Sequence, residues 1–510
     1  MNVPAVTPLF AAIDMGASSA RLLAGRLQGG SLQTREVARL GNGPVRLPDG
    51  LHWDLLRLYQ GMLDGLARLS GGHAGPLWVG IDGWGVDYGL LDRAGHLLGL
   101  PFHYRDPRTD GKVAEADALL GAGRAYEATG IQTMQINTIY QLMAERESAA
   151  YGVAHRLLLV PDLFGWLLTG QARREATNTS TTQMVDVRDG RPVDWLLDRL
   201  GLRTDLLAEP VVAGEVLGPI LGPVADGAGV STGAHVVAVA THDTASAVLA
   251  VPAVVEDFAY LVSGSWSLVG LELPAAVVDE RTRAANFSNE TGIDGTVRFL
   301  RNVMGHWVIQ ECERAWAAAG EAGPLAELLG AAGQLPPFRW LFDTASAELA
   351  HPGGMPGKVR EACRRAGGPV PDSPPEIVRC TVDSMALAVA AALEDAQRCA
   401  GRRVSVLHVV GGGSANGLLL RSVAAATGLP VVAGPVEASA VGNMLVQMRA
   451  AGLVGDRASM RSLVAASFAL SRVVPEPALV EAADAARGRL ARAGAGGNQV
   501  ALGPGAPAPA

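Results

Sequence analysis

The chain has 510 residues, of which 49% are hydrophobic and 18% charged, and its net charge is −8. A chain of this length exceeds what one hydrophobic core usually supports, so we expect two or three domains. Because there is no basic excess, nucleic acid is not expected as a partner. No apolar run reaches the roughly 18 residues of a membrane span, and the first ten residues contain no Lys or Arg. We therefore expect a cytoplasmic protein that neither binds a membrane nor carries a signal peptide.

The four cysteines are Cys312, Cys363, Cys380 and Cys399. None belongs to a CxxC pair and no histidine cluster accompanies them, so a zinc site is not expected. Such sparse cysteine suits a reducing compartment. Cys363 and Cys380 flank a proline-rich stretch and could pair, but free thiols are the expectation.

Strand patterns alternate with helix patterns along the chain, which indicates an α/β fold. In the first half the predicted strands cover residues 9–14, 21–27, 77–82 and 235–240. A short turn of small residues joins the first two strands, and the third leads into a glycine-rich stretch. This order predicts a hairpin followed by α/β units.

A second half begins near residues 248–257 and repeats this plan. Strands at 258–262 and 266–273 flank a Ser-Gly-Ser turn, and they are followed by a strand at 404–410, a glycine triplet, a helix at 415–427, a strand at 429–433 and a helix at 442–451. We expect an N-terminal domain over residues 1–250, a C-terminal domain over 251–480, and a disordered Gly/Ala/Pro-rich tail over 493–510.

Asp243 lies where the predicted strand 235–240 gives way to a helix pattern of small residues. A carboxylate at a strand end lies where clefts form in α/β folds, and a helix N-terminus favours its ionised state. Such a carboxylate can accept a proton from a substrate hydroxyl. The alternative is a structural N-cap, because Asp is favoured at that position. This segment alone does not decide between the two.

Three turns of small residues could bind phosphate groups through their backbone N–H groups. They are residues 16–19 with Arg21 just beyond, residues 264–265, and the glycine triplet 411–413. Asp14 could hold a water bound to Mg²⁺, which prefers oxygen ligands. Taken singly, a turn of Gly and Ser between strands is more often an ordinary hairpin turn, and the glycine triplet could simply serve the start of a helix. The chain has neither a GxxxxGK[ST] motif nor a GxGxxG opening a βαβ unit, so a P-loop enzyme and a Rossmann dehydrogenase are disfavoured.

Six motifs in chain order resemble the FGGY family of carbohydrate kinases. They are DMGASS at 14–19, GIDGWGVDY at 80–88, YRDPRT at 104–109, HDTAS at 242–246, SGSWS at 263–267 and GGG at 411–413. Four further segments are similar to one subfamily, whose acceptor is a deoxy ketose: GIQ at 130–132, NT at 137–138, RNVMG at 301–305 and GPVEAS at 434–439. The resemblance spans roughly residues 9–470.

This resemblance implies an α/β fold of two actin-like ATPase (ribonuclease H-like) domains around a central cleft. It implies transfer of the γ-phosphate of ATP, with Mg²⁺, to a sugar hydroxyl. Asp243 is then the catalytic base, and Asp14 organises the metal. The implied sugar contacts are Gly85, His242, Asp243, Thr244 and Asn302. The implied nucleotide contacts are Ala17, Ser18, Ser19, Ala20, Arg21, Ser265, Gln310 and Gly412.

At two positions the chain departs from the family pattern. Ala20 stands where the family commonly has Gly, and Gly83 stands where it commonly has Thr. Near the second of these, Asp87 is expected to hold the glycine-rich loop through backbone hydrogen bonds. The charged segment 105–110 either borders the sugar pocket or forms a solvated turn with internal ion pairs.

The acceptor is the least determined part of this hypothesis. The methyl group of a deoxy sugar needs an apolar wall, for which Trp84, Tyr88 and Phe102 are candidates, although aromatic residues are more often part of the core. The alternatives are a kinase of the same family that acts on another ketose or polyol, such as fuculose, xylulose or glycerol, and a non-catalytic actin-like sugar sensor. A dehydrogenase is a distant third. The expected partners are a sugar and ATP, and the expected state is a monomer or homodimer.

Overall fold

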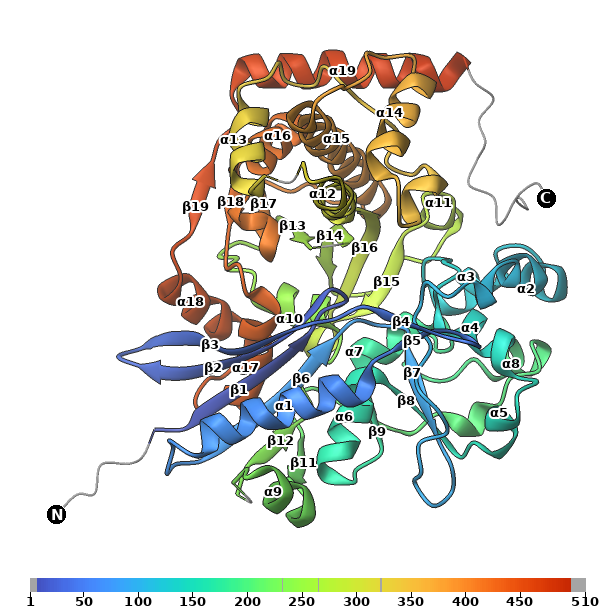
Figure 1. Cartoon of the computed structure of the whole chain (residues 1–510), viewed down its shortest axis with the longest axis vertical. Helices are drawn as coiled ribbons and strands as arrows, with labels where there is room; N and C mark the ends of the chain where they lie inside the picture. The colour runs from blue at the N-terminus through green and yellow to red at the C-terminus, as the bar shows by residue number, and fades with distance from the viewer. Residues whose placement is uncertain (1–6, 232, 265, 322, 497–510) are drawn as a thin grey trace.

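The computed structural model of the chain describes residues 7–231, 233–264, 266–321 and 323–496. Two α/β parts lie one above the other in Figure 1, with the N-terminal half below and most of the C-terminal half above. A six-stranded sheet forms the centre of the lower part and a seven-stranded sheet forms the centre of the upper part. No helix within the described ranges is long and apolar enough to cross a bilayer.

The first sheet has the strand order β11-β12-β6-β1-β2-β3. β1 is antiparallel to β2 and parallel to β6, and β6 is parallel to β12. The strands are β1 (Leu9–Met15), β2 (Ser19–Gln28), β3 (Ser31–Gly41), β6 (Leu77–Gly83), β11 (Val216–Pro219) and β12 (His235–Val237).

The second sheet has the order β15-β16-β14-β13-β17-β18-β19. β13 is antiparallel to β14 and parallel to β17, and β17 is parallel to β18, so β16-β14-β13-β17-β18 repeats the plan of β3-β2-β1-β6-β12. This duplication confirms the predicted actin-like, ribonuclease H-like fold class. The strands are β13 (Phe258–Ser263), β14 (Trp266–Leu273), β15 (Ser288–Thr291), β16 (Val297–Met304), β17 (Val406–Val410), β18 (Val431–Ala433) and β19 (Ser471–Val473).

β1 shows why the first sheet is covered on both faces. All seven of its residues are buried. Successive side chains of a strand point to opposite faces. Leu9 and Ile13 accordingly pack in the core formed with α1 (Leu55–Ser70) and α6 (Val160–Thr169), whereas Phe10 and Ala12 pack with α10 (Asp243–Leu249) and α17 (Ala438–Ala450).

The helix α17 belongs to the second half of the chain but packs against the first sheet. It contacts β1, β6 and α10, and the following helix α18 (Arg457–Ser467) contacts β3. Both helices lie beside the blue strands β1–β3 in Figure 1. The two halves therefore share a packed layer, formed by α10 and α17.

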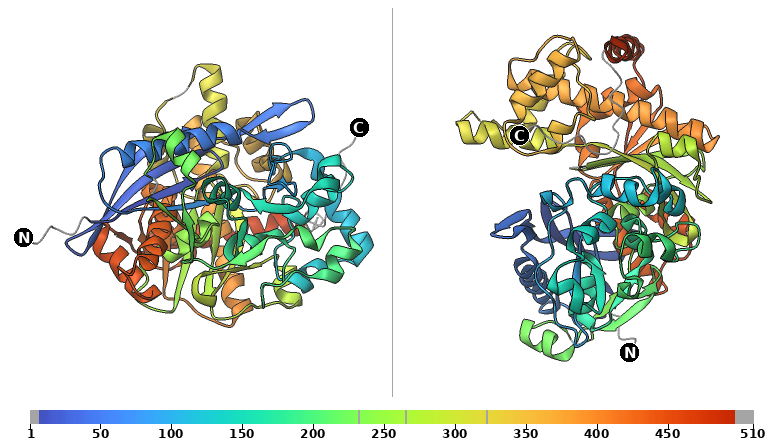
Figure 2. Two further views of the ribbon diagram at one scale, coloured as in Figure 1. Left: turned by 90° about the horizontal axis from the view of Figure 1, so that it is seen from below. Right: turned by 90° about the vertical axis from the view of Figure 1, so that its right-hand side faces the viewer.

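The upper part surrounds its sheet with helices, among which α15 is buried along most of its length. The helix α19 crosses the top of the molecule in Figure 1 and is seen end-on in the right-hand view of Figure 2. The helical segments of this part are α11 (Glu280–Ala284), η4 (Ile293–Gly295), α12 (Trp307–Ala319), α13 (Leu325–Gly333), η5 (Ala347–Ala350), α14 (Met355–Arg365), α15 (Pro374–Ala400), η6 (Gly412–Ala415), α16 (Gly417–Thr427) and α19 (Pro477–Gly496).

The lower part carries an additional region between β6 and β12, which forms one side of the cleft described below. Its strands are β7 (Tyr88–Leu91), β8 (Arg156–Leu159), β9 (Arg173–Glu175) and β10 (Glu209–Val211), preceded in the chain by β4 (Pro44–Leu47) and β5 (Gly50–Trp53). Its other helical segments are η1 (Pro107–Thr109), α2 (Lys112–Leu120), α3 (Arg124–Thr129), α4 (Thr138–Glu145), α5 (Ala149–Val153), α7 (Ala176–Thr179), η2 (Ser180–Thr182), α8 (Asp194–Arg199), η3 (Thr204–Leu206) and α9 (Gly222–Ala228).

Some local predictions differ from the structure. The strand predicted over 235–240 ends at Val237, because the backbone of Ala238 pairs instead with the loop at Gly214 and Glu215. The helix α19 continues to Gly496, so the first four residues of the predicted tail 493–510 are helical, and the rest lie outside the described residues. All four cysteines are buried and free; the sulfur atoms of Cys363 and Cys380 lie 3.4 Å apart.

Candidate active site

A cavity of about 610 Å³ lies between the two parts, within the usual size range of small-molecule sites. Residues from both hairpin turns line it. In the first turn the N–H of Gly16 donates to the carbonyl of Ser19 (3.0 Å), and in the second the N–H of Gly264 donates to that of Trp266 (2.9 Å). The equivalent turns of the two sheets thus meet at one cavity.

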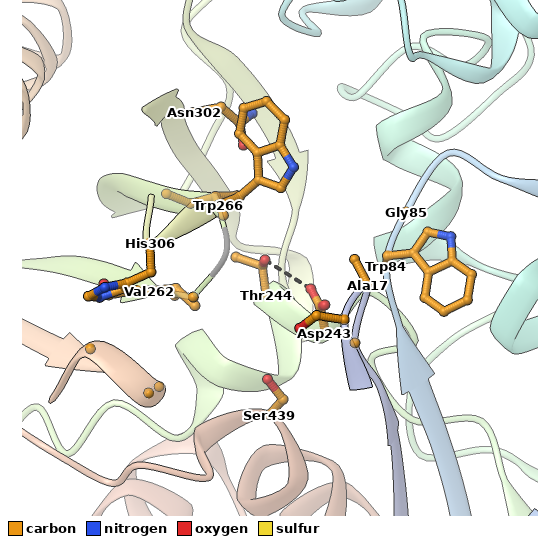
Figure 3. Close-up of a pocket in the computed structure, with 18 of the residues that line it drawn as sticks. Ala17, Trp84, Gly85, Asp243, Thr244, Val262, Trp266, Asn302, His306 and Ser439 are labelled. Atoms are coloured by element: carbon orange, nitrogen blue, oxygen red, sulfur yellow. Dashed lines mark hydrogen bonds between the residues drawn. The ribbon is translucent and has the colours of Figure 1, made fainter. Parts of the chain in front are cut away.

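Asp243 is the first residue of α10, and its side chain is exposed to the cavity for 28% of its area. The N-cap position is held by His242, and no side chain caps this helix. The N-cap interpretation of Asp243 is therefore wrong. Its Oδ1 atom accepts a hydrogen bond from Thr244 Oγ1 (3.1 Å), drawn as a dashed line in Figure 3. The carboxylate consequently remains available to a ligand.

The segment before Asp243 is anchored on both sides. The N–H of Gly83 donates to the carbonyl of Thr241 (2.9 Å), which ties the segment to β6. On the other side, Glu175 Oε2 accepts from the N–H of Thr241 (3.0 Å) and from the N–H of Thr177 (3.0 Å). Burial raises the pKa of Glu175, although these hydrogen bonds oppose the shift. A rigid backbone thus holds Asp243 in place.

Two more carboxylates lie on adjacent strands beside Asp243. Asp14 is the cross-strand partner of both Asp82 and Arg21. Arg21 Nη2 lies 2.5 Å from Asp14 Oδ2, and its Nη1 contacts Glu437. Burial raises the pKa of Asp14 to about 6, against the opposing effect of Arg21, and raises that of Asp82 further. The structure therefore gathers the predicted metal-organising acid, the predicted base and a cation.

Burial also raises the pKa of Asp243, although His242, Thr244 and Arg298 act in the opposite direction. A general base works only when ionised, so we expect kcat/KM to fall as the pH falls through this raised pKa. The acid limb should therefore lie at higher pH than for an exposed aspartate, and Asp14, with a pKa of about 6, should contribute to it. A pH profile of kcat/KM checks this expectation. A profile that stays flat down to the ordinary aspartate range would contradict it.

The predicted sugar contacts Gly85, His242, Thr244 and Asn302 all line the cavity. Asn302, on β16, donates through Nδ2 to Gln132 Oε1 (2.9 Å) in the opposite half of the chain. The two indole rings Trp84 and Trp266 lie on opposite sides of the cavity in Figure 3 and offer apolar surface. The predicted sugar contacts and the two rings thus combine amide and hydroxyl groups with aromatic walls, as sugar recognition requires.

Of the three aromatic candidates, only Trp84 lines the cavity. Tyr88 donates to Glu145 and belongs to a separate core, whereas the Phe102 ring contacts His52. Both residues are therefore structural.

Asp87 holds the loop that carries Trp84 and Gly85, mostly through side chains. Its Oδ2 accepts from Trp53 Nε1 (2.6 Å), from Trp84 Nε1 (3.0 Å) and from the N–H of Tyr104 (3.2 Å). Burial raises the pKa of Asp87 to about 6, although these donors oppose the shift. Asp87 thus holds the loop as predicted, but it does so chiefly by accepting hydrogen bonds from indole N–H groups, which sequence spacing does not reveal.

The charged segment 105–110 directly follows Tyr104, which lines the cavity, although its own residues do not line it. The guanidinium of Arg105 lies 4.3 Å from the ring centroid of Trp307 and 5.4 Å from that of Trp266, both in the second half of the chain. Asp106 accepts from the N–H of Leu51 (2.7 Å) and is buried. The segment is therefore not a solvated turn.

Most of the predicted nucleotide contacts also line the cavity: Ala17, Ser18, Ser19, Arg21, Gln310 and Gly412. Ala20 does not line it, because this residue is buried in β2 opposite Met15. Ser265 lies outside the described residues. A Cβ atom at Gly83 would lie 2.9 Å from the carbonyl oxygen of Met15, which explains why a threonine does not fit here.

Gly413 provides a test of the close packing around the glycine loop 411–413. An added Cβ would lie 2.2 Å from Ser263 Oγ and 2.9 Å from His306 Nε2, whereas at Gly417 the nearest atom would be 3.6 Å away. We expect Gly413→Ala to raise the KM for the nucleotide, because the glycine loop must shift out of the cavity. Gly417→Ala is the control and should leave that KM unchanged. Equal KM values for both variants would show that the loop position does not matter.

Sequence reasoning missed several residues that the structure places at the cavity. Glu290 and His306 line it, and Arg298 lies directly behind Glu290. Glu290 and Arg298 are cross-strand partners on β15 and β16. The available signal was two opposite charges in neighbouring strands, but their pairing depends on the strand register.

Comparison with solved structures shows the same two-domain fold throughout. Gluconate kinase from Lactobacillus acidophilus superposes with a TM-score of 0.80 at 14% identity, covering 98% of this chain and 99% of that one. Plasmodium falciparum glycerol kinase with ADP gives a TM-score of 0.76 at 12% identity, covering 95% and 98%. These likenesses define the class of the protein as a two-domain actin-like ATPase fold.

Sequence comparison is more specific. The models of the N-terminal and C-terminal domains of the FGGY family of carbohydrate kinases match residues 9–250 and 259–451. A rhamnulokinase from Bacteroides thetaiotaomicron is 38% identical over 92% of this chain and 96% of its own length, and one from Pectobacterium carotovorum subsp. carotovorum is 40% identical over 91% and 92%. The chain belongs to the FGGY family of carbohydrate kinases and is a sugar phosphotransferase.

Proposed function

We propose that this protein transfers the γ-phosphate of ATP to O1 of L-rhamnulose and forms L-rhamnulose 1-phosphate, in the catabolism of L-rhamnose. The observation that carries this proposal is the position of Asp243, whose carboxylate does not cap its helix and lies in a cavity lined by both hairpin turns. The rhamnulokinases that match most of the chain support the choice of sugar.

The donor set on the nucleotide side fits Mg²⁺ and a triphosphate. Small residues at both turns and at 411–413 line the cavity, so phosphate oxygens can approach the backbone there without meeting bulky side chains. Among the described residues no three His, Cys, Asp or Glu side chains are grouped to hold a metal ion. Mg²⁺ commonly needs only one or two carboxylates, completed by phosphate oxygens and water. Asp14 would supply that carboxylate, and the bound ion would neutralise charge on the phosphates.

Within this arrangement the chemical task of the protein is small. Asp243 accepts the proton of the sugar hydroxyl while the hydroxyl oxygen forms its bond to phosphorus and the bond to the leaving ADP oxygen breaks. Thr244 donates to Oδ1 and so fixes the rotation of the carboxylate. Arg21 places positive charge beside the phosphate-binding turn. Side chains from both halves exclude water from the transfer.

A substrate panel tests this proposal. ADP release is measured with MgATP and L-rhamnulose, and in parallel with L-fuculose, D-xylulose and glycerol. We expect release that depends strongly on L-rhamnulose and a 1-phosphate product. Preference for another sugar would keep the kinase and replace the acceptor. Intact ATP with every sugar, together with tight ATP binding, would favour a sugar sensor.

A further inference from the structure

A chain of four side chains crosses the cleft and ends at Asp243. Arg298 Nη1 lies 2.9 Å from Glu290 Oε2, and His242 Nδ1 lies 3.3 Å from the same oxygen. On the far side of the ring, His242 Nε2 lies 3.7 Å from Asp243 Oδ1. Glu290 and Arg298 come from the second sheet, whereas His242 and Asp243 come from the first half of the chain. The mechanism above uses only the last of these residues.

Glu290 is the stronger of the two acceptors that flank the imidazole. Arg298 is 1% exposed, and together with the neighbouring donors it lowers the pKa of Glu290 to about 2 in spite of burial. Asp243 is farther from the ring, beyond hydrogen-bond distance, and already accepts from Thr244. A carboxylate can only accept, so a neutral imidazole between these groups places its single proton on Nδ1, facing Glu290.

The burial of these groups supports the pairing. Among the described residues, His242 Nδ1 and Glu290 Oε2 are both buried polar atoms that lack a partner of full hydrogen-bond geometry. A small rotation of the ring would satisfy both atoms at once, and leaving both unpaired would cost stability. With Nδ1 committed to Glu290, Nε2 carries a lone pair next to the Asp243 carboxylate. The cavity then presents two acceptors side by side, which two neighbouring hydroxyl groups of one ligand can satisfy together.

We propose that Glu290, held by Arg298, is a positioning residue that fixes the tautomer and orientation of His242, so that Nε2 accepts a hydrogen bond from a second sugar hydroxyl near the one that Asp243 deprotonates. This inference rests on the proposed function for its ligand. It names the chemical class that the site takes, a neutral sugar with neighbouring hydroxyl groups. It also makes recognition depend on both halves of the chain, since each contributes one side of the His242–Glu290 contact.

The first arm of the test needs no sugar. Protein labelled with ¹⁵N-histidine is studied by NMR at a pH where the ring is neutral, and the His242 signals are assigned by their loss in His242→Gln. We expect the wild-type proton on Nδ1. In Glu290→Leu the side chain offers Nδ1 no acceptor, so the proton moves to Nε2, where the Asp243 carboxylate accepts it. A wild-type proton on Nε2, or a tautomer unchanged in Glu290→Leu, would overturn the proposal.

The second arm uses the acceptor that the substrate panel identifies, with its mono-deoxy analogues. We expect Glu290→Leu to lower kcat/KM for the sugar by about 10–100-fold and to leave the KM for MgATP unchanged. In wild type, one deoxy analogue should be strongly disfavoured, and in Glu290→Leu that discrimination should disappear. Discrimination equal to wild type would overturn the assignment of Nε2 to a hydroxyl.

Glu272→Leu is the matched control. Glu272 is the other cross-strand neighbour of Arg298, is similarly buried, and pairs with Arg461 (3.0 Å) without lining the cavity. Its replacement should change neither the His242 tautomer nor analogue discrimination. If both variants behaved alike, the effect at Glu290 would be one of general stability. If the wild type phosphorylated no sugar, the proposed function would fail while the NMR arm still decided the role of Glu290.

Discussion

Replacing Asp243 with asparagine is expected to lower kcat for sugar phosphorylation by about 10²–10⁴-fold, the usual contribution of a general base. The amide keeps the size of the side chain but cannot accept the proton of the hydroxyl. Since this carboxylate is not the cap of the helix, the loss should be one of turnover and not of folding. ADP release at saturating sugar and MgATP, with near-UV circular dichroism to verify the fold, measures the effect.

Asp456 supplies the control, because it is a true N-cap. Its carboxylate accepts from the N–H of Ser459 (2.9 Å) at the start of α18, far in the chain from Asp243. Asparagine caps a helix about as well as aspartate, so Asp456→Asn should retain wild-type activity. Near-normal turnover in a folded Asp243→Asn protein would remove Asp243 from the role of base.

The sequence was sufficient to predict the hairpins and the order of the two halves. Each hairpin combines apolar strands with a turn of small residues, and both signals are local. The strand predicted at 9–14 corresponds to β1, and the one at 258–262 to β13. The duplicated topology then followed from the family resemblance. Strand register, which pairs Asp14 with Asp82, required the structure.

The placement of α17 could not be predicted from the chain. Its pattern of small and apolar residues indicates a buried helix, but such a pattern does not specify which sheet covers it. The proposed domain boundary between residues 250 and 251 divides the chain by sequence. In the structure, α17 follows that boundary in the chain but packs on β1 and β6, which precede it. Long-range packing of this kind depends on how the surfaces of a helix and a sheet fit together, and the spacing of apolar residues in the sequence does not specify that fit.

The candidate site shows the same limit. The ligand contacts that the family resemblance implies all line the cavity where they are described, except Ala20, whose position in β2 directs it into the core. Two of the three aromatic residues predicted as an apolar wall, Tyr88 and Phe102, do not line it. The motifs did not reveal Glu290, because its meaning comes from Arg298 on the next strand and His242 in the other half. Local motifs thus identify loops that approach a ligand, whereas charge networks between elements become visible only in the structure.

Replacing Gly442 with alanine is expected to lower the free energy of unfolding by about 1–3 kcal/mol, the usual cost of overpacking. An added Cβ would lie 1.8 Å from the carbonyl oxygen of Ser246 and 2.5 Å from its carbon, so α17 and α10 would have to separate. Because α10 begins with Asp243, a displacement of about 1 Å could also lower kcat by about 10²-fold. Denaturant unfolding and ADP release measure the two effects.

Gly357→Ala, in α14, is the matched control, since no atom lies within 4 Å of an added Cβ there. Alanine should stabilise that helix by about 0.5–1 kcal/mol. If Gly442→Ala were as stable as wild type, the two helices would be free to separate and their contact could not fix the base. If it lost stability but kept its kcat, the contact would serve only the core. Asp243 would then be positioned by the bonds of Thr241 to Gly83 and Glu175 alone.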